Sequence, residues 1–586
     1  MIAPIASASE MAQLNHDSAV RQVNSLSRRL LSSVRPLVIA PMIPVPNRYL
    51  RMGRLLPLRY PVADRSDASL LALGNVQAHA GGTLVTSNLP PGGGAELVVV
   101  ANRLPVDRVQ DAPDTSDGSS PAPEQWRGSP GGLVTALEPV MRGANGAWVG
   151  WAGQADLELE PFDFDGTRLI PVTLSAEDVE LYYEGFSNDT IWPLYHDVIS
   201  PPRYIMPWRE AYVRVNRRFA AAAAEAVAQG GTVWVQDYQL QLVPKMLREL
   251  RPDVTIGYFH HIPFPAYGLY SQLPWRKQVL EGLLGADVIG FQRVADAGNF
   301  ARAVRRQLRY ETRASGIRVP LPDGQTHVAA VQAFPISIDT ASYAELASRP
   351  EVIARAAEIR EGLGNPRRIV LGVDRLDYTK GIRHRIKAYG ELLAEGRIDV
   401  ADVTLVQVAS PSRERVAAYM QLRDEIELSV GRINGTFDST GHSAIRYLHH
   451  SYPREEMAAL FLAADVMLVT AVRDGMNLVA KEYVAARADN RGVLVLSEFA
   501  GASDELTTAL LINPHDIEGL KDAIMQAIDM PEAEQGRRMR ALRRRVFKHD
   551  IEAWSRTFLA ALQHARAHNQ AHIRHPHDET NESHDA

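Results

Sequence analysis

An apolar run, a polar elbow and a helix follow one another within residues 465–483, and this order constrains the fold more than any other stretch. Asp465–Thr470 reads as a buried strand, and good helix formers begin at Met476. The free N–H groups at the start of such a helix can face a phosphate. Asp474 lies on the elbow between them, where a carboxylate can contact a ligand or cap the helix. Spacing alone leaves both roles open.

Similar apolar runs that end in polar side chains recur along the chain. Glu96–Arg103 ends in an arginine, Thr232–Asp237 ends in a carboxylate, and Thr255–Phe259 leads into His261. Ligands of doubly wound α/β sheets bind at the carboxyl ends of their strands. We therefore predict an α/β protein whose site collects Arg103, Asp237 and His261 at one edge of a sheet. Asp237 and His261 lack a third ligand at a compatible spacing, so we predict no metal site there.

Length and composition narrow the class of protein. A chain of 586 residues is too long for one ordinary core, so we expect two packed domains with tails. The net charge of -6 argues against nucleic acid or an anionic membrane as the main partner. The chain has no cysteine, which fits a reducing compartment, and it has no apolar run of the roughly 20 residues that span a bilayer. We expect a cytoplasmic protein.

Four segments follow from these patterns. Residues 1–95 are rich in Ala, Ser, Arg, Pro and Gly, which predicts a disordered extension. We expect residues 96–335 and 336–563 to form two Rossmann-like domains, with a final helix over Met539–Gln563. The family resemblance given below implies that this helix crosses back to the first domain. Residues 564–586 are polar and His-rich, which predicts a disordered tail.

The segment Arg473–Glu482 resembles the donor-site signature of trehalose-6-phosphate synthases, the retaining glycosyltransferases of family 20. The run Arg375–Gly381 matches the same family, and the similarity covers about residues 96–560. The resemblance implies the two-domain B fold of glycosyltransferases, with two doubly wound domains facing a cleft. It also implies transfer of glucose from a nucleotide sugar, UDP-glucose first among the candidates, to glucose 6-phosphate. It implies no cofactor, and a homo-oligomer, dimer or tetramer.

The family also implies which residues hold the donor. Arg375 and Lys380 follow a strand and precede a helix, so two cations and a helix terminus converge where a pyrophosphate would lie. Surface ion pairing is the alternative for these two side chains. An acidic group at Glu482, one turn into the helix, suits ribose hydroxyls. The implied donor set is Gly131, Gly132, Arg375, Lys380, Tyr452, Leu478, Val479, Ala480, Lys481 and Glu482.

On the acceptor side the resemblance implies Arg103, Tyr183, Asp237 and Arg413, with Trp192 and Ile262 shaping the sugar pocket and selecting the anomer. The catalytic set it implies is Asp237, His261, Arg375, Lys380 and Asp474. Two other functions stay open: synthesis of a related glucoside phosphate such as glucosylglycerol phosphate, and a non-catalytic regulatory subunit.

Two further segments carry structural expectations. Asp163–Thr167 spells the D-x-D-G-T motif of haloacid-dehalogenase-like phosphatases, but Asp-Gly between short strands favours a hairpin turn. Gly431–Gly435 matches the family, and we expect a structural loop there.

Overall fold

The computed structural model describes residues 94–109, 126–129, 146–313, 316–321 and 324–574, together with Val134, Leu137 and Met141. The predictions made for residues 1–93, for Gly131 and Gly132, and for residues 575–586 lie outside this part of the chain.

The first sheet has a parallel centre with antiparallel strands added at its two edges. Its ten strands run in the order β10-β11-β12-β9-β8-β7-β1-β4-β6-β5. The direction of winding reverses between β1 and β7, which opens a crevice at the carboxyl ends of these two strands. The bounds are β1 (Ala95–Arg103), β4 (Ala147–Trp151), β5 (Phe162–Phe164), β6 (Thr167–Pro171), β7 (Val227–Gln236), β8 (Thr255–His260), β9 (Val288–Phe291), β10 (Thr312–Arg313), β11 (Gly316–Pro320) and β12 (Thr326–Ala333).

Helices and short turns connect these strands. The segment between β6 and β7 begins with α3, continues as a wide helix of π type, η2, and leads through α4 into the long helix α5. β2 (Val106–Arg108) and β3 (Trp126–Gly128) pair with each other as a separate two-stranded antiparallel sheet. The helices of this domain are α3 (Ala176–Asp178), η2 (Val179–Ile191), α4 (Trp192–Tyr195), α5 (Met206–Ala226), η3 (Tyr238–Leu240), α6 (Val243–Leu250), α7 (Tyr267–Tyr270), α8 (Arg276–Leu283) and α9 (Val294–Gln307).

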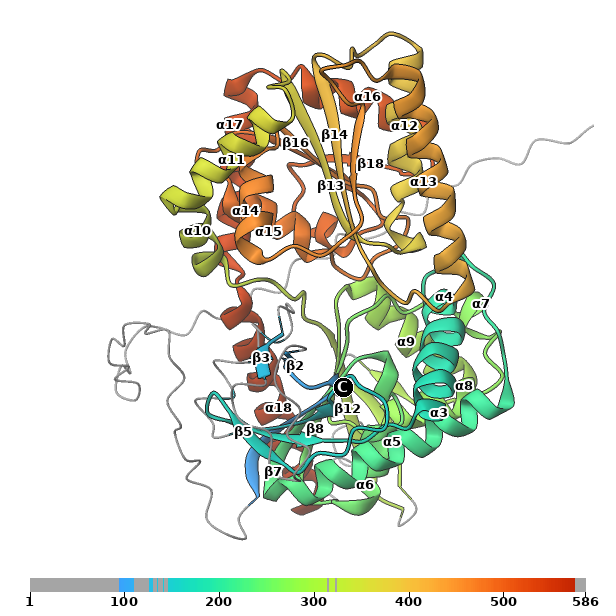
Figure 1. The fold of residues 1–586 in the computed structure, drawn as a ribbon. Coiled ribbons are helices and arrows are strands. Elements are labelled where there is room, and N and C mark those ends of the chain that lie inside the picture. Colours follow the sequence, from blue (N-terminus) through green and yellow to red (C-terminus); the bar gives the residue numbers. More distant parts are fainter. Residues whose placement is uncertain are drawn as a thin grey trace, which may run out of the picture. The chain divides into compact units, whose positions relative to one another are not determined.

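The second sheet is parallel throughout, in the order β15-β14-β13-β16-β17-β18 (Figure 1). Taken in chain order this is 3-2-1-4-5-6, the strand order of dinucleotide-binding domains, and it reverses between β13 and β16. Its strands are β13 (Arg368–Arg375), β14 (Val403–Ser410), β15 (Ile445–Leu448), β16 (Val466–Val469), β17 (Val493–Ser497) and β18 (Leu510–Ile512). Its helices are α10 (Thr340–Ser348), α11 (Pro350–Gly362), η4 (Tyr378–Lys380), α12 (Ile382–Ala394), α13 (Ala417–Phe437), α14 (Arg454–Ala463), α15 (Leu478–Ala486), η5 (Gly501–Asp504), α16 (Ile517–Ile528) and α17 (Glu532–Lys548).

The last helix, α18 (Ile551–Arg574), returns to the first sheet and packs on β8, β9 and β12 (Figure 1). The Phe558 ring stacks on Trp234, with ring centroids 4.4 Å apart. Gly257 and Gly290 make room for it, since a Cβ on either would lie 2.8 Å from the Phe558 ring. The Trp554 indole N–H donates to the carbonyl of Phe334, on the segment that crosses between the domains, at 3.1 Å.

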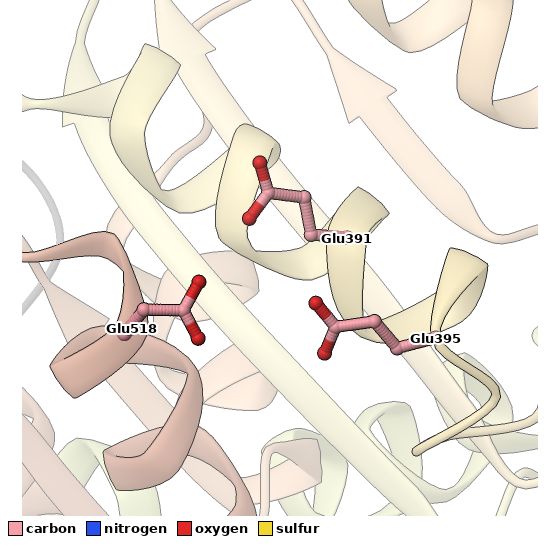
Figure 2. A group of neighbouring side chains, drawn as sticks. All are labelled: Glu391, Glu395 and Glu518. Carbon is pink, nitrogen blue, oxygen red and sulfur yellow. The ribbon is translucent and has the colours of Figure 1, made fainter.

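A buried lysine joins two helices of the second domain. Figure 2 shows Glu391 from α12, Glu395 just after that helix and Glu518 from α16 converging. The Lys521 ammonium, whose side chain is 2% exposed, lies 3.4, 2.5 and 2.7 Å from these three carboxylates. The acidic cluster therefore already holds its cation within the protein.

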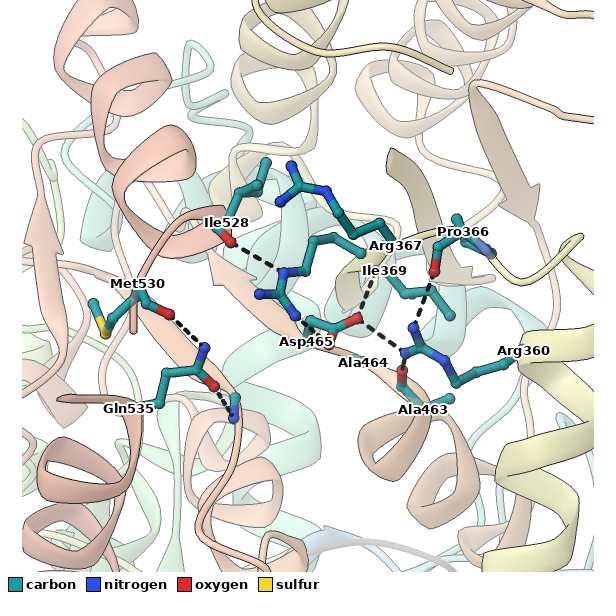
Figure 3. Close-up of polar contacts among 12 residues, drawn as sticks. Arg360, Pro366, Arg367, Ile369, Ala463, Ala464, Asp465, Ile528, Met530 and Gln535 are labelled. Atoms are coloured by element: carbon teal, nitrogen blue, oxygen red, sulfur yellow. Dashed lines mark hydrogen bonds and ion pairs between the residues drawn. The ribbon is translucent and has the colours of Figure 1, made fainter. Parts of the chain in front are cut away.

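The amino ends of β13 and β16 are fixed by a second network, which Figure 3 shows around Asp465. One carboxylate oxygen of Asp465 accepts from the Arg360 guanidinium at 2.9 Å and from the backbone N–H of Ile369 at 2.8 Å. Arg360 also donates to the carbonyl of Ala463 at 2.6 Å. This network fixes the register of β13 and β16 at their amino ends. It thereby fixes the relative positions of their carboxyl ends, where the strand order reverses.

Several local expectations meet the structure here. The hairpin at Asp163–Thr167 is confirmed: β5 and β6 are antiparallel, and Asp165 and Gly166 have φ of 49° and 77°, as a tight turn of type I′ requires. The loop expected at Gly431–Gly435 is wrong, because these residues lie inside α13, where Ile433 packs against Gly390.

The single helix expected over Met539–Gln563 is two helices. α17 ends at Lys548, and Asp550 begins a new helix by accepting from the N–H of Ala553 at 2.9 Å. A disordered tail was expected from residue 564, but α18 continues to Arg574. Asn569 on that extension donates to Asp287 at 2.9 Å, which holds the extra turns against the first sheet.

No helix in the described ranges is long and apolar enough to cross a membrane.

The packing of α18 can be tested with Phe558→Ala. Phe558 is completely buried, so the truncation removes its contacts and leaves a cavity, at a cost of about 3–5 kcal/mol of unfolding free energy. Phe547→Ala on the neighbouring helix α17 is the matched control, because Phe547 is 39% exposed and should cost less than about 1 kcal/mol. Urea unfolding of both variants gives the comparison. Equal shifts of the two midpoints would contradict this account of the α18 contact.

Candidate active site

A cavity of about 410 Å³ lies where the carboxyl ends of the two sheets meet. It receives side chains from the ends of β7, β8 and β9 in the first domain and from the ends of β13, β14 and β16 in the second. Both reversals of winding direction lie at this edge, so the cavity occupies the place where doubly wound sheets bind ligands. The predicted residues that line it are Tyr183, Trp192, Asp237, His261, Ile262, Arg375, Lys380, Arg413, Asp474, Leu478 and Val479.

Lys380 and Asp474 form an ion pair across the reversal of the second sheet. The lysine Nζ donates to Asp474 Oδ2 at 2.6 Å, and each side chain is 13% exposed. Burial alone would raise the pKa of the Asp474 carboxyl, but the Lys380 ammonium and the Asn477 amide hold it below its ordinary value. Asn477, not Asp474, caps α15, because its side chain accepts from the N–H of Ala480 at 3.0 Å. The cap role left open for Asp474 is thus excluded.

A fully buried arginine fixes the loop that carries Lys380. Arg385 has no exposed surface, and its guanidinium donates to the Lys380 carbonyl at 3.0 Å and to Thr470 Oγ1 at 2.8 Å. It also lies 2.6 Å from Asp374, the last buried residue of β13. Gly372 provides the necessary space, since a Cβ there would be 2.2 Å from Arg385 Nη1. Arg385 therefore makes hydrogen bonds to both loops, the one that carries Lys380 and the one that leads to Asp474.

In the first domain, Asp237 and His261 meet as their strand ends predicted. The backbone N–H of His261 donates to Asp237 Oδ1 at 3.1 Å. Burial raises the pKa of Asp237 to about 6, although backbone N–H groups and the guanidinium of Arg413 act in the opposite direction. Asp237 adopts φ of 68° with ψ of 174°, a conformation that costs a non-glycine residue energy and aims its side chain away from the strand.

The His261 ring is held on both nitrogens. Its Nε2 lies 2.9 Å from Gln236 Oε1, which can only accept, so Nε2 carries the proton. Its Nδ1 then accepts from Gln292 Nε2 at 3.4 Å. Burial lowers the pKa of His261 to about 3, so the imidazole stays neutral near pH 7.

Arg413 reaches the cavity already ordered by its neighbours. Its guanidinium donates to the Tyr238 hydroxyl at 3.0 Å and to the Tyr419 hydroxyl, and it lies 3.3 Å from Asp377. The Tyr238 contact joins the second domain to the first. Only 5% of the Arg413 side chain is exposed, so the charge is directed into the cavity wall and not into bulk solvent.

The indole of Trp192 supports two arginines. Arg413 Cζ lies 3.8 Å from the ring centroid and Arg375 Cζ lies 5.5 Å from it. An aromatic ring at these distances attracts a guanidinium. Trp192 thus places two cations at the edge of the cavity.

Arg103 lies beside the cavity and does not line it. Its side chain is 46% exposed, it pairs with Asp107 at 3.4 Å, and its guanidinium lies 5.2 Å from the Trp151 ring centroid. The Tyr183 ring packs against the same tryptophan, with centroids 5.9 Å apart. The Trp151 ring therefore lies between Arg103 and Tyr183, and only Tyr183 lines the cavity.

Of the five predicted donor residues on α15, Leu478 and Val479 line the cavity and Ala480, Lys481 and Glu482 do not. The Lys481 ammonium points away from it, donating to the Ile336 carbonyl at 2.8 Å and to Glu505 at 2.5 Å. It therefore joins α15 to the crossing segment, and its side chain cannot contact a ligand in the cavity.

Glu482 and Tyr452 do not line the cavity. Glu482 is half-buried, and burial raises its pKa to about 7 against the opposing charge of Arg454. Tyr452 precedes α14 and packs its ring 4.2 Å from that of His450.

Two arginines form ion pairs that hold the domains together beside the cavity. Arg473, next to Asp474, lies 3.2 Å from Asp197 and 3.6 Å from Asp296 of the first domain. Arg293, which follows β9, forms a bidentate pair with Asp504 at 2.8 and 2.7 Å. Gly475 brings the backbones into contact, because a Cβ there would lie 2.2 Å from the carbonyl oxygen of His261.

The prediction from sequence missed several residues of the wall. Gln292 directly follows β9, so the rule that found Asp237 and His261 would have found it as well. His196 lies four residues after Trp192, one helical turn away, and also lines the cavity. The remaining residues of the wall carry no distinguishing signal in the sequence: Tyr238, Gln239, Ile336, Asp374, Met476 and Asn477.

Within the described residues, the one trio of side chains spaced to hold a metal ion is Glu391, Glu395 and Glu518, and Lys521 occupies it.

Comparisons with known proteins agree with this geometry. A trehalose-6-phosphate synthase of Mycolicibacterium gilvum is 56% identical over 486 residues, which is 81% of this chain and 95% of the relative. One of Mycolicibacterium smegmatis is 56% identical over 474 residues, 80% of this chain and 93% of the relative. A UDP-forming alpha,alpha-trehalose-phosphate synthase of Burkholderia xenovorans in complex with glucose-6-phosphate has a TM-score of 0.71 and 33% identity, covering 80% of this chain and 99% of that one. A trehalose-6-phosphate protein from E. coli bound with UDP-2-fluoro glucose has a TM-score of 0.70 and 33% identity, covering 80% and 98%.

The two doubly wound domains and their shared cavity define a glycosyltransferase of the two-domain B fold, as the resemblance implied. The model of glycosyltransferase family 20 matches residues 95–564, and the chain belongs to this family.

The close approach of the two backbones at Gly475 can be tested with Gly475→Ala. The added methyl group has no room against the His261 carbonyl, so Asp474 and the start of α15 must move. We expect affinity for a nucleoside diphosphate, measured by calorimetry, to fall about 10- to 100-fold, because displacements of about 1 Å in a site have effects of this size. Gly431→Ala in α13, where a Cβ meets nothing within 4 Å, should leave affinity unchanged. Unchanged affinity in Gly475→Ala would refute the proposed contact.

Proposed function

We propose that this chain transfers glucose from UDP-glucose to glucose 6-phosphate with retention of the α configuration, forming α,α-trehalose 6-phosphate. The observation that carries the proposal is the convergence of Arg375, Lys380 and the start of α15 with Asp237 and Arg413 in one cavity. The first set suits a pyrophosphate, and the second suits a phosphorylated sugar. The relatives named above support the choice of substrates.

On the donor side, the pyrophosphate would lie against Arg375, Lys380 and the free N–H groups of Leu478 and Val479. The Asn477 cap occupies the N–H of Ala480, while the first N–H groups of a helix have no partner inside the helix. Asp474 would bind hydroxyl groups of the glucose. Tyr452 and Glu482 would contact the base and the ribose, and Gly131 and Gly132, outside the described residues, would approach the donor phosphate.

On the acceptor side, Arg413, Tyr183 and Arg103 would hold the phosphate of glucose 6-phosphate. Arg413 suits a phosphate dianion because Asp377 neutralises only part of the positive charge gathered by Arg413 and Arg375. Asp237 would hold the attacking hydroxyl, and Ile262 and Trp192 would shape the pocket around the sugar. His261 would contact the donor glucose as a neutral imidazole.

The same residues suggest a front-face mechanism. The acceptor oxygen would bond to the anomeric carbon on the side from which the diphosphate departs, and the leaving phosphate oxygen would take the hydroxyl proton. Positive charges placed in advance at a leaving group stabilise the transition state. Arg375 and Lys380 are placed for this, so we propose that the reaction needs no metal ion.

Because the chain contains no cysteine, we propose a reducing compartment, the cytoplasm. From the family resemblance we propose a homo-oligomer, dimer or tetramer, which light scattering coupled to gel filtration would measure.

The proposed reaction predicts one product. With UDP-glucose and glucose 6-phosphate, the protein should release UDP and form α,α-trehalose 6-phosphate, identified by mass and by the anomeric proton couplings. ADP-glucose, GDP-glucose and glycerol 3-phosphate as alternative substrates test the base and the acceptor. Faster turnover with glycerol 3-phosphate would replace the proposal with glucosylglycerol-phosphate synthesis, and no turnover with any pair would favour a regulatory subunit.

Removal of metal ions tests the charge argument. Turnover should be unchanged when EDTA is added in excess over all divalent ions in the assay, because EDTA removes a weakly held divalent ion. Activity that EDTA abolishes and magnesium restores would contradict the metal-free proposal.

Lys380→Ala tests the role of the lysine in the transition state. Charge developing on the leaving group is greatest in the transition state, so kcat should fall about 100- to 1000-fold while the donor KM changes little. Lys387→Ala on α12 is the control, because that lysine is 62% exposed and 3.8 Å from Glu391. A large rise in donor KM with kcat unchanged would reassign Lys380 to ground-state binding. Because the variant leaves Asp474 without its cation, it should also unfold at lower urea concentration.

A further inference from the structure

His196 is a buried residue of the cavity wall to which the proposed mechanism gives no role. It follows α4 and is 2% exposed, and its ring lies 4.2 Å from the Trp192 ring. The next two residues, Asp197 and Val198, take φ of 57° and 60°, which turns the chain so that Asp197 reaches Arg473. The histidine is therefore placed between Trp192 of the first domain and the elbow of the second.

The hydrogen bonds of His196 determine which nitrogen carries the proton. Its Nδ1 lies 2.7 Å from the carbonyl oxygen of Trp192. A carbonyl oxygen only accepts, so Nδ1 carries the proton and Nε2 presents a lone pair. Among the described residues Nε2 has no hydrogen-bond partner, and the residue lines the cavity. The ring thus offers an acceptor and no charge: burial lowers the pKa of His196 to about 4, against the raising effects of its bond to Trp192 and of Asp377 and Asp474.

The surroundings of the ring point to the donor side of the cavity. Asp474 and Lys380, the pair proposed to hold the glucose and the pyrophosphate, both act electrostatically on the imidazole. Asp377 is the third such charge, and it is already paired with Arg413. The pyrophosphate is an acceptor like the Nε2 lone pair and cannot bond to it. A hydroxyl group of the sugar can donate to it.

We propose that His196 Nε2 accepts a hydrogen bond from one hydroxyl group of the glucose being transferred, which makes His196 a specificity-determining residue for the sugar of the donor. The inference rests on the proposed function, because it requires a hexose beside Asp474. Trp192 is then the residue that positions the imidazole, through its carbonyl oxygen and its ring.

His196→Asn tests this, because an asparagine amide can still donate to the Trp192 carbonyl but does not reach the position of Nε2. We expect kcat/KM for UDP-glucose to fall about 10- to 100-fold, as when a site built for a hydroxyl loses its partner, with the KM for glucose 6-phosphate unchanged. His196→Gln, whose longer side chain can bring an amide oxygen near that position, should recover part of the loss. His384→Asn on α12, outside the cavity wall, is the control and should match the unmodified protein.

Donors that lack one hydroxyl group at C2, C3, C4 or C6 identify the contact. The unmodified protein should lose about 10- to 100-fold with the deoxy donor that lacks the bound hydroxyl, and His196→Asn should lose nothing further with that donor. Equal losses in both proteins for all four donors would overturn the proposal. The proposal would also be overturned if the loss from His196→Asn failed to add to the loss from a deoxy substrate only for deoxy forms of glucose 6-phosphate. The histidine would then bind the acceptor.

A measurement on the unmodified protein covers the case in which the asparagine variant does not fold. With 15N-labelled histidine, the Nε2 resonance of His196, assigned with His196→Gln, should shift on addition of UDP-glucose and not on addition of UDP. An equal shift with both ligands would overturn the proposal. If the unmodified protein transfers no glucose, the proposed function itself fails, which is a different outcome from transfer that does not depend on His196.

Discussion

The ion pair between Lys380 and Asp474 is the interaction on which the rest of the site depends. It bridges the reversal of the second sheet, where the loop after β13 and the loop after β16 diverge. Breaking such a buried pair is costly, because removal of either partner leaves an uncompensated charge in the protein interior. Arg385 holds both loops in place, since its guanidinium donates hydrogen bonds to the Lys380 carbonyl and to the Thr470 hydroxyl. Donor phosphates would therefore meet charges that are already in place.

Much of the site is held in backbone conformations that the chain would not choose by itself. Asp237, Arg413 and Asn477 all have positive φ, of 68°, 50° and 85°. Such positions cost about 1–3 kcal/mol each for residues other than glycine, and asparagine tolerates them best. The fully buried strands that end beside them, and the contact of α18 with the first sheet, supply the stability that maintains these conformations.

A simple rule recovered a good part of the site from sequence: polar residues that follow apolar strands face the ligand edge. It placed Asp237 and His261 correctly in one cavity but was wrong for Arg103, which lies beside that cavity, and it would have found Gln292 had it been applied to β9. The rule fails for helices. Lys481 lies in the same signature as Leu478 and Val479, yet its ammonium turns to Glu505, because a helix distributes successive side chains around its axis. Gly431–Gly435 is a second failure on a helix: its match to the family led us to expect a loop, while packing of Ile433 against Gly390 keeps the segment helical.

The sequence by itself determined the class of fold and the family, because apolar runs and a ten-residue signature are local properties of the chain. Tertiary structure decided which partners those residues take. His196 shows this most directly: in the sequence it is one histidine after an aromatic stretch, and the fold gives it a fixed tautomer and a place beside Asp474. Contacts between Tyr238 and Arg413, or between Gly475 and the His261 carbonyl, join residues more than a hundred positions apart. No local pattern encodes such distances, because they depend on how two separate sheets are brought edge to edge.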